Sequence, residues 1–96
     1  MILVVVPNGS SSDSWLYHIE KQYWRKTWSL PRNAYGATGI VSDDLGYVVG
    51  GYDNTGVAPS ELTVSVYTPM SGWQDVATWS DNVAHHVRAV LFPPEF

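Results

Sequence analysis

The side chains in this sequence that could do chemistry are few, and their spacing argues against catalysis. His85 and His86 are adjacent, and adjacent residues on a strand point to opposite faces, so the two imidazoles cannot easily share a metal ion. The chain has no cysteine, which excludes a thiol nucleophile, a thiolate metal site and a disulfide scaffold. No spacing of serine, histidine and aspartate, and no pair of acids, rises above chance. We therefore predict a protein that is not an enzyme and carries no cofactor.

Tryptophans are the other chemically distinctive side chains, and there are five of them. Indole faces stack on sugars, so this content favours a carbohydrate-binding protein as one alternative. Packing explains most of them better, because they recur at corresponding positions of predicted strands; these are Trp24, Trp28, Trp73 and Trp79. Trp15 stands outside that pattern, and it is the tryptophan that we expect to contact a sugar under this alternative.

The charge balance excludes nucleic acid as a partner. Five Lys and Arg residues are outnumbered by nine Asp and Glu residues, and the net charge is −4, so a basic stripe for a phosphate backbone is missing. A hydrophobic content of 45% is too high for disorder, and we predict one folded unit over residues 1–96. No stretch reaches the length of a membrane span, and the opening MILVVV lacks the basic start and cleavage site of a leader. We expect no membrane partner, and the cytoplasm is slightly favoured.

Short segments rich in β-branched and aromatic residues account for nearly all of the chain. The clearest is 62–67, in which Leu62, Val64 and Val66 lie on one side of a predicted strand. No segment of useful length shows helical periodicity, so we predict an all-β fold. The predicted strands are 2–6, 15–19, 23–28, 35–41, 46–49, 62–67, 73–79 and 85–92.

The order of features repeats along the chain. Tyr17 and Tyr67 lie about 50 residues apart, and so do Trp24 and Trp73. Each copy has a tyrosine, a short polar turn, a strand with tryptophan, a polar break and then a strand of small residues. A period of about 50 residues with four strands is typical of the blades of kelch-type propellers.

On these marks the chain resembles the kelch-repeat family. Two further marks are the Gly50-Gly51 doublet after a YVV strand, and Arg32 before the strand that begins a blade. The second unit matches better than the first, in which Pro7-Asn8 stands at the position of the glycine doublet. In the partial third unit, Asn82 stands at the position of the arginine. The resemblance implies four-stranded antiparallel blades of a β-propeller over nearly the whole chain.

The glycine doublet sets the phase of the repeat. If the strand 46–49 is the second of a blade, residues 2–28 hold strands two to four of one blade. Residues 34–79 then form a complete second blade, and 85–92 form the first strand of another. The chain is thus expected to contain about two blades in a permuted phase.

Two blades alone would expose packing faces and strand edges, whereas a propeller has roughly four to eight blades. We expect one of two solutions. Either the chain is part of a longer propeller, or copies form a ring in which 85–92 of one copy pairs with 2–6 of the next. A trimer with six blades is preferred over a dimer or a tetramer.

Long connections on a rigid scaffold are where binding residues tend to lie. In an antiparallel blade, the connections from strand two to three and from strand four to the next blade emerge at the same end; here these are 8–14, 52–61, 29–34 and 80–84. We predict that they bind a protein or peptide; the alternative is an oligomeric, trimeric six-bladed lectin. The sequence does not identify the ligand. The candidate partner-binding residues are Arg32, Asn33, Tyr52, Asp53, Asn54, Asp81 and Asn82, with Trp15 for the lectin.

Overall fold

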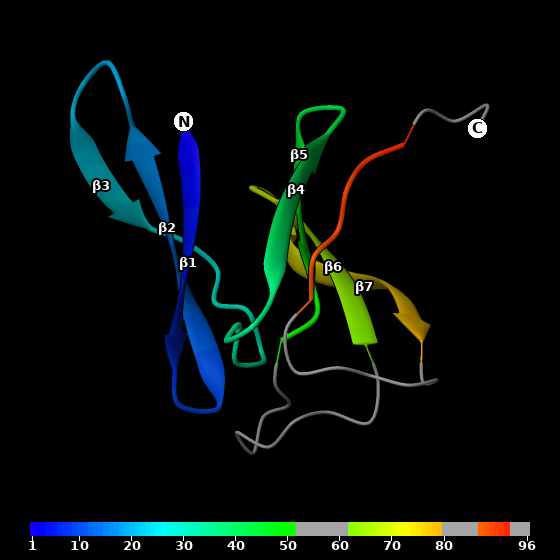
Figure 1. Cartoon of the computed structure of the whole chain (residues 1–96). Helices are drawn as coiled ribbons and strands as arrows, with labels where there is room; N and C mark the ends of the chain where they lie inside the picture. Colours follow the sequence, from blue (N-terminus) through cyan, green and yellow to red (C-terminus); the bar gives the residue numbers. More distant parts are fainter. Residues whose placement is uncertain (52–61, 80–86, 93–96) are drawn as a thin grey trace.

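The computed structural model describes residues 1–51, 62–79 and 87–92, which fold into two antiparallel β-sheets (Figure 1). The first sheet has three strands in the order β1 (Ile2–Asn8), β2 (Ser11–His18) and β3 (Tyr23–Lys26). The second has four, in the order β4 (Thr38–Ser42), β5 (Leu45–Val49), β6 (Leu62–Thr68) and β7 (Gly72–Trp79). The predicted all-β class is confirmed. In this described part there is no helix that could cross a membrane.

The serine-rich segment near the N-terminus is a strand and not a loop. We predicted a long connection at 8–14, but the turn consists of Gly9 and Ser10 alone, and β2 follows directly. Alternate serines of this strand, Ser12 and Ser14, are fully buried at 0% exposure. Their hydroxyls have hydrogen-bond partners, which offset the cost of removing them from water. The loop prediction was wrong because it rested on polarity alone.

The predicted strand 23–28 ends two residues early, because β3 stops at Lys26. The indole of Trp28 therefore does not share a strand face with Trp24, as a regular strand would require. It packs against Gly72 instead, where an added Cβ would come within 2.9 Å of its ring. The following strand also starts later than the predicted 35–41, at Thr38 of β4. Residues 27–37, which we call the linker, therefore join the two sheets through irregular backbone.

The predicted strand 85–92 is wrong over its described part, because 87–92 belongs to neither sheet. The backbone N–H of Val87 in this segment donates to the carbonyl of Gly36 at 2.9 Å. A strand needs a neighbouring edge along its length, and nothing in the described residues supplies one to this segment. His85 and His86 lie outside the described residues.

The tight turn predicted at 42–44 is confirmed. Asp43 and Asp44 connect β4 to β5 as a two-residue hairpin loop, and both have positive φ, at 52° and 63°. This is the pattern of a type I′ turn, whose twist matches that of the flanking strands. Aspartate tolerates the left-handed region better than most residues, which explains the Asp-Asp sequence at this site.

The two sheets carry the same cross-strand aromatic pair. Tyr17 of β2 lies opposite Trp24 of β3, with ring centroids 4.8 Å apart. Tyr67 of β6 lies opposite Trp73 of β7, with centroids 5.4 Å apart. Both pairs join a strand to the strand that follows it in sequence. The residues that marked the repeat in the sequence are therefore paired neighbours in both sheets.

The sheets pack through this pair of the four-stranded sheet, which faces β2 and the start of the linker. The indole N–H of Trp73 donates to Ser14 Oγ and to the carbonyl of Trp28, each at 3.1 Å. The hydroxyl groups of Tyr67 and Thr27 are hydrogen-bonded at 2.6 Å. Polar groups buried between the sheets thus satisfy one another, and their geometry sets how one sheet sits on the other.

Replacing Trp73 with phenylalanine should lower the free energy of unfolding by about 1–2 kcal/mol, because Ser14 Oγ would lose its indole donor while remaining buried. Urea unfolding followed by circular dichroism measures the loss. Trp24→Phe is the matched control, since Trp24 is 57% exposed and its change should stay within about 0.5 kcal/mol. Equal losses in the two variants would contradict the role of the indole N–H.

Candidate functional site

The connections at one end of the two sheets converge on Asn33. Its side-chain amide N–H donates to the carbonyl of Gly9 in the β1–β2 turn at 2.7 Å, and its Oδ1 accepts from the backbone N–H of Tyr35 at 2.8 Å. Gly51, just beyond β5, approaches so closely that an added Cβ would lie 2.6 Å from the carbonyl oxygen of Asn33. Figure 1 shows the linker coiling between the two sheets at this end. Asn33 therefore lies at a corner where three connections meet.

Ser12 holds the linker backbone on both sides of Arg32. Its hydroxyl donates to the carbonyl of Arg32 at 2.9 Å and accepts from the N–H of Ala34 at 2.8 Å. Its backbone exchanges two hydrogen bonds of 2.9 Å with Leu30, whose side chain is fully buried. The alternation of β2 points Ser12 inward, so a strand of the first sheet positions the linker.

The side chain of Arg32 leaves this fixed backbone and enters the four-stranded sheet. Its Nε donates to the carbonyl of Gly50 at 2.8 Å, and its Nη2 donates to the carbonyls of Thr63 and Val48 at 3.1 and 3.3 Å. The planar guanidinium presents its donors as a fork, which suits carbonyls from two neighbouring strands. One arginine thus caps the adjacent ends of β5 and β6.

The remaining edge of the guanidinium meets a polar pair on the face of the sheet. Nη1 of Arg32 donates to Ser65 Oγ at 2.5 Å and lies 3.7 Å from Asp75 Oδ1. The hydroxyl of Ser65 donates in turn to the same Asp75 oxygen at 2.6 Å. Burial lowers the pKa of Arg32, and the carboxylate of Asp75 partly offsets this. The side chain is only 11% exposed, so its charge is held inside the protein by this pair.

These contacts give Arg32 a structural role, because its Nε, Nη1 and Nη2 all bond within the chain. That it also contacts a partner stays a prediction. Asn33 lies beside it at the corner described above. Tyr52, Asp53, Asn54, Asp81 and Asn82 lie outside the described residues. Gly51, which directly precedes Tyr52 in the sequence, lies at the Asn33 corner. Trp79, the last residue of β7, pairs with Leu62, the first residue of β6.

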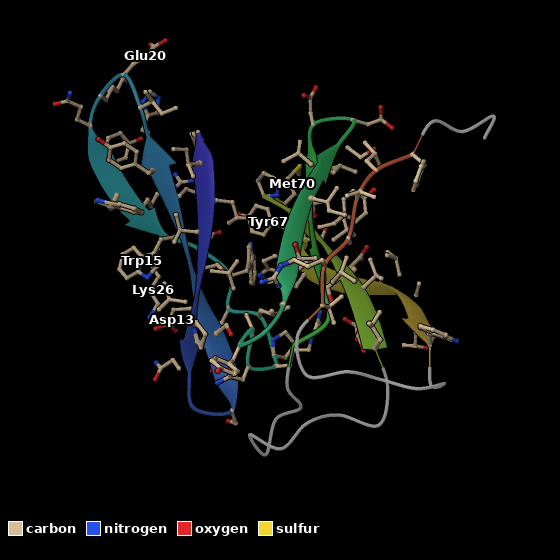
Figure 2. The ribbon with its side chains drawn as sticks, in the orientation of Figure 1. Asp13, Trp15, Glu20, Lys26, Tyr67 and Met70 are labelled. Carbon is tan, nitrogen blue, oxygen red and sulfur yellow. The ribbon has the colours of Figure 1, made fainter. Side chains whose placement is uncertain are left out.

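The structure does not bring Trp15 to this corner. Trp15 lies on the face of the first sheet that points away from the four-stranded sheet (Figure 2). Lys26 Nζ lies 5.8 Å from the centre of its indole ring and 3.8 Å from Asp13 Oδ1. Val4, Val6 and Trp24 line an open apolar hollow together with Trp15. The sequence-predicted candidates therefore divide between two separate surfaces.

Sequence reasoning missed the residues that hold Arg32, namely Ser12, Ser65 and Asp75. Two signals could have found them. Ser12, Ser14 and Leu16 are alternate residues, so a strand that starts at residue 11 would place all three side chains on the same face. Asp75 is the one acidic residue in the predicted strand 73–79, so it was the residue of that strand with which a cation such as Arg32 could pair.

Among residues 1–51, 62–79 and 87–92, no three His, Asp or Glu side chains gather closely enough to hold a metal ion. The side chains of Ser12, Arg32 and Asn33 are hydrogen-bonded within the chain. Comparisons with models of protein families, with curated proteins and with solved structures find no match. The function is therefore argued from the geometry of the chain.

Proposed function

We propose that this chain is a kelch-like, two-blade unit of a β-propeller that binds a protein or peptide without catalysis. The observation that carries the architecture is the recurrence of one cross-strand pair, Tyr17 with Trp24 and Tyr67 with Trp73, on corresponding strands of the two sheets. Strands β1 to β3 correspond to strands two to four of one blade, and β4 to β7 correspond to a whole blade. The packing of one sheet on the other supports the same proposal.

The open edge of β1 is where a further strand would complete the first blade. β1 and β4 are each an edge strand of their sheet, and an apolar cleft of about 540 Å³ lies between them. A strand added at β1 would pair with the backbone groups along this edge of the sheet. We propose that segment 85–92 of another copy, or a further part of a longer chain, supplies it. Val90 and Leu91 in that segment are exposed and would become buried. Three copies would give six blades.

Partner binding is assigned to the connections around Asn33. The corner is rigid, because hydrogen bonds hold Asn33 and its neighbours on both sides. The predicted connections 52–61 and 80–84 follow β5 and β7 in the sequence. The predicted contact residues in them include Asp53 and Asp81, so basic side chains are expected in the partner.

Selection of peptides from a displayed random library tests this proposal. Peptides selected on the wild-type protein should lose at least about tenfold in affinity for the Tyr52→Ala, Asp53→Ala double variant, since a few side chains carry most binding energy. The matched control is Asp43→Asn, Asp44→Asn, which changes the hairpin at the opposite end while keeping residues that tolerate positive φ. A library that yields no binder, or binders equally sensitive to the control, would refute binding at these connections.

The alternative function is an oligomeric lectin that uses Trp15. What favours it is the open hollow of Val4, Val6, Trp15 and Trp24, beside the polar pair of Asp13 and Lys26. An aromatic surface next to hydrogen-bonding groups is suited to a sugar ring. A glycan array separates the two proposals: binding that disappears in Trp15→Ala, with an unchanged circular dichroism spectrum, would support the lectin.

A further inference from the structure

The outward side of the three-stranded sheet is an apolar surface without a neighbour among the described residues. Alternate residues of β1, β2 and β3 form it, and we call it the outer face. Its apolar residues are Ile2, Val4, Val6, Trp15, Tyr17 and Trp24, and the ion pair of Asp13 and Lys26 lies on it as well. Figure 2 shows the Trp15, Asp13 and Lys26 side chains on this side, away from the four-stranded sheet. Trp24 is 57% exposed, and Ile2 and Val6 are 48% and 45% exposed. A surface of this kind commonly marks an interaction site.

The outer face has a counterpart in the same chain that is covered. The pair Tyr67 and Trp73 occupies in the four-stranded sheet the positions that Tyr17 and Trp24 occupy in the outer face. Tyr67 is only 5% exposed, because the three-stranded sheet and the linker lie on it. The tyrosine is therefore buried in the four-stranded sheet, whereas the tryptophan of the corresponding pair is exposed in the three-stranded sheet.

The surface that covers Tyr67 and Trp73 also has a counterpart. Ser14 of β2 and the linker residue Trp28 provide the cover. Their counterparts in the repeat lie on the four-stranded sheet: Val64 of β6 corresponds to Ser14, and Trp79 of β7 corresponds to Trp28. Trp79 pairs with Leu62 and is 57% exposed. One molecule thus offers both an aromatic pair with an exposed Trp24 and, on the other sheet, the surface that corresponds to the cover, with an exposed Trp79.

We propose that the outer face of one copy docks on this surface of a second copy, on the side of Leu62, Val64 and Trp79. The contact between the two sheets inside the chain is its template. In this arrangement Trp24 becomes covered by the second copy, as Trp73 is covered by Ser14 and Trp28, to which it is hydrogen-bonded. The number of copies follows from the proposed propeller, whereas the docking contact is argued from these side chains.

The charges differ between the two contacts in a consistent way. Within the chain, Arg32 meets Asp75, which lies two residues after Trp73. The residue two after Trp24 is Lys26, and the sequence counterpart of Arg32 is the uncharged Asn82. An arginine there would repel Lys26, so the sequence replaces both members of the ion pair together. Such matched replacement is expected if the outer face receives a second copy of this chain.

Sedimentation velocity at several micromolar concentrations tests the docking. Wild-type protein should sediment as an assembly larger than 10.7 kDa. Trp24→Asp should weaken self-association at least about 30-fold, because a charge would enter a desolvated contact, while Trp24→Phe should keep it. Met70→Asp is the matched control: Met70 is 92% exposed in the β6–β7 turn, so the same added charge should change nothing.

Each other outcome overturns the docking. A wild-type protein that stays at 10.7 kDa throughout excludes a second copy as the occupant. An assembly that Trp24→Asp leaves intact would show that copies join elsewhere, for example by strand addition at β1. Glycan binding by the assembled protein that is lost in Trp15→Ala would show that a sugar occupies this face. Failure of the peptide selection would leave the docking result unaffected, so the two proposals fail separately.

Discussion

Replacing Arg32 with methionine should lower the free energy of unfolding by about 3 kcal/mol or more, since hydrogen bonds made by a charged group contribute about 1.5–3 kcal/mol each and are not additive. Methionine fills part of the space but leaves the carbonyls of Gly50 and Thr63 without their donor. It also leaves Asp75 beside Ser65 without a cation. Chemical unfolding followed by circular dichroism measures the loss.

Two controls separate the fork of donors from the charge. Arg32→Lys keeps the charge but cannot reach two strands at once, so we expect it to lose most of the same stability. Asp75→Asn should cost less than about 1 kcal/mol, because the side chain of Asp75 is 62% exposed and its ion pair is weakened by solvent. If Arg32→Lys were as stable as wild type, the hydrogen bonds to the sheet would not be the cause.

The arginine also shows what the sequence could predict and what it could not. Strand 62–67 and the Asp43-Asp44 turn were predictable, because alternation and turn chemistry are local properties. The match of Tyr17 with Tyr67 predicted which residues would occupy corresponding positions. Arg32 was marked by its place in the repeat, but its hydrogen bonds join it to residues 16 to 33 positions away. Such contacts depend on how one sheet lies on the other, which no local pattern contains.

Errors at the strand ends have the same origin. The run of serines before Trp15 looks like a loop, because polarity alone does not reveal that two hydroxyls are buried and hydrogen-bonded. Segment 87–92 has the composition of a strand, yet a strand forms only where an edge is available to pair with it. Its sequence favours the strand conformation, and the proposed second copy would supply the edge with which it pairs.

Replacing Gly51 with alanine should lower the free energy of unfolding by more than about 4 kcal/mol, because backbone strain and a steric clash act together. Gly51 has a φ of +106°, outside the region that alanine tolerates, and the new Cβ would lie 2.6 Å from the carbonyl oxygen of Asn33. Gly9→Ala is the control, because Gly9 has a φ of +66° with nothing within 4 Å of the added Cβ. It should cost only about 1–2 kcal/mol. Thermal unfolding of both variants gives the comparison.

A double substitution distinguishes the two glycines of the doublet. At Gly50, an added Cβ would meet the side chain of Val87 at 2.9 Å, so Val87→Ala should recover part of the loss caused by Gly50→Ala. At Gly51 the obstacle is the backbone oxygen of Asn33, which the bonds of Ser12 to the linker hold in place, so Val87→Ala should recover nothing. Recovery of both variants by Val87→Ala would mean that one flexible contact, and not the approach of two backbones, requires the doublet. Recovery of Gly50→Ala alone would identify Gly51 as the glycine that the meeting of the two sheets demands.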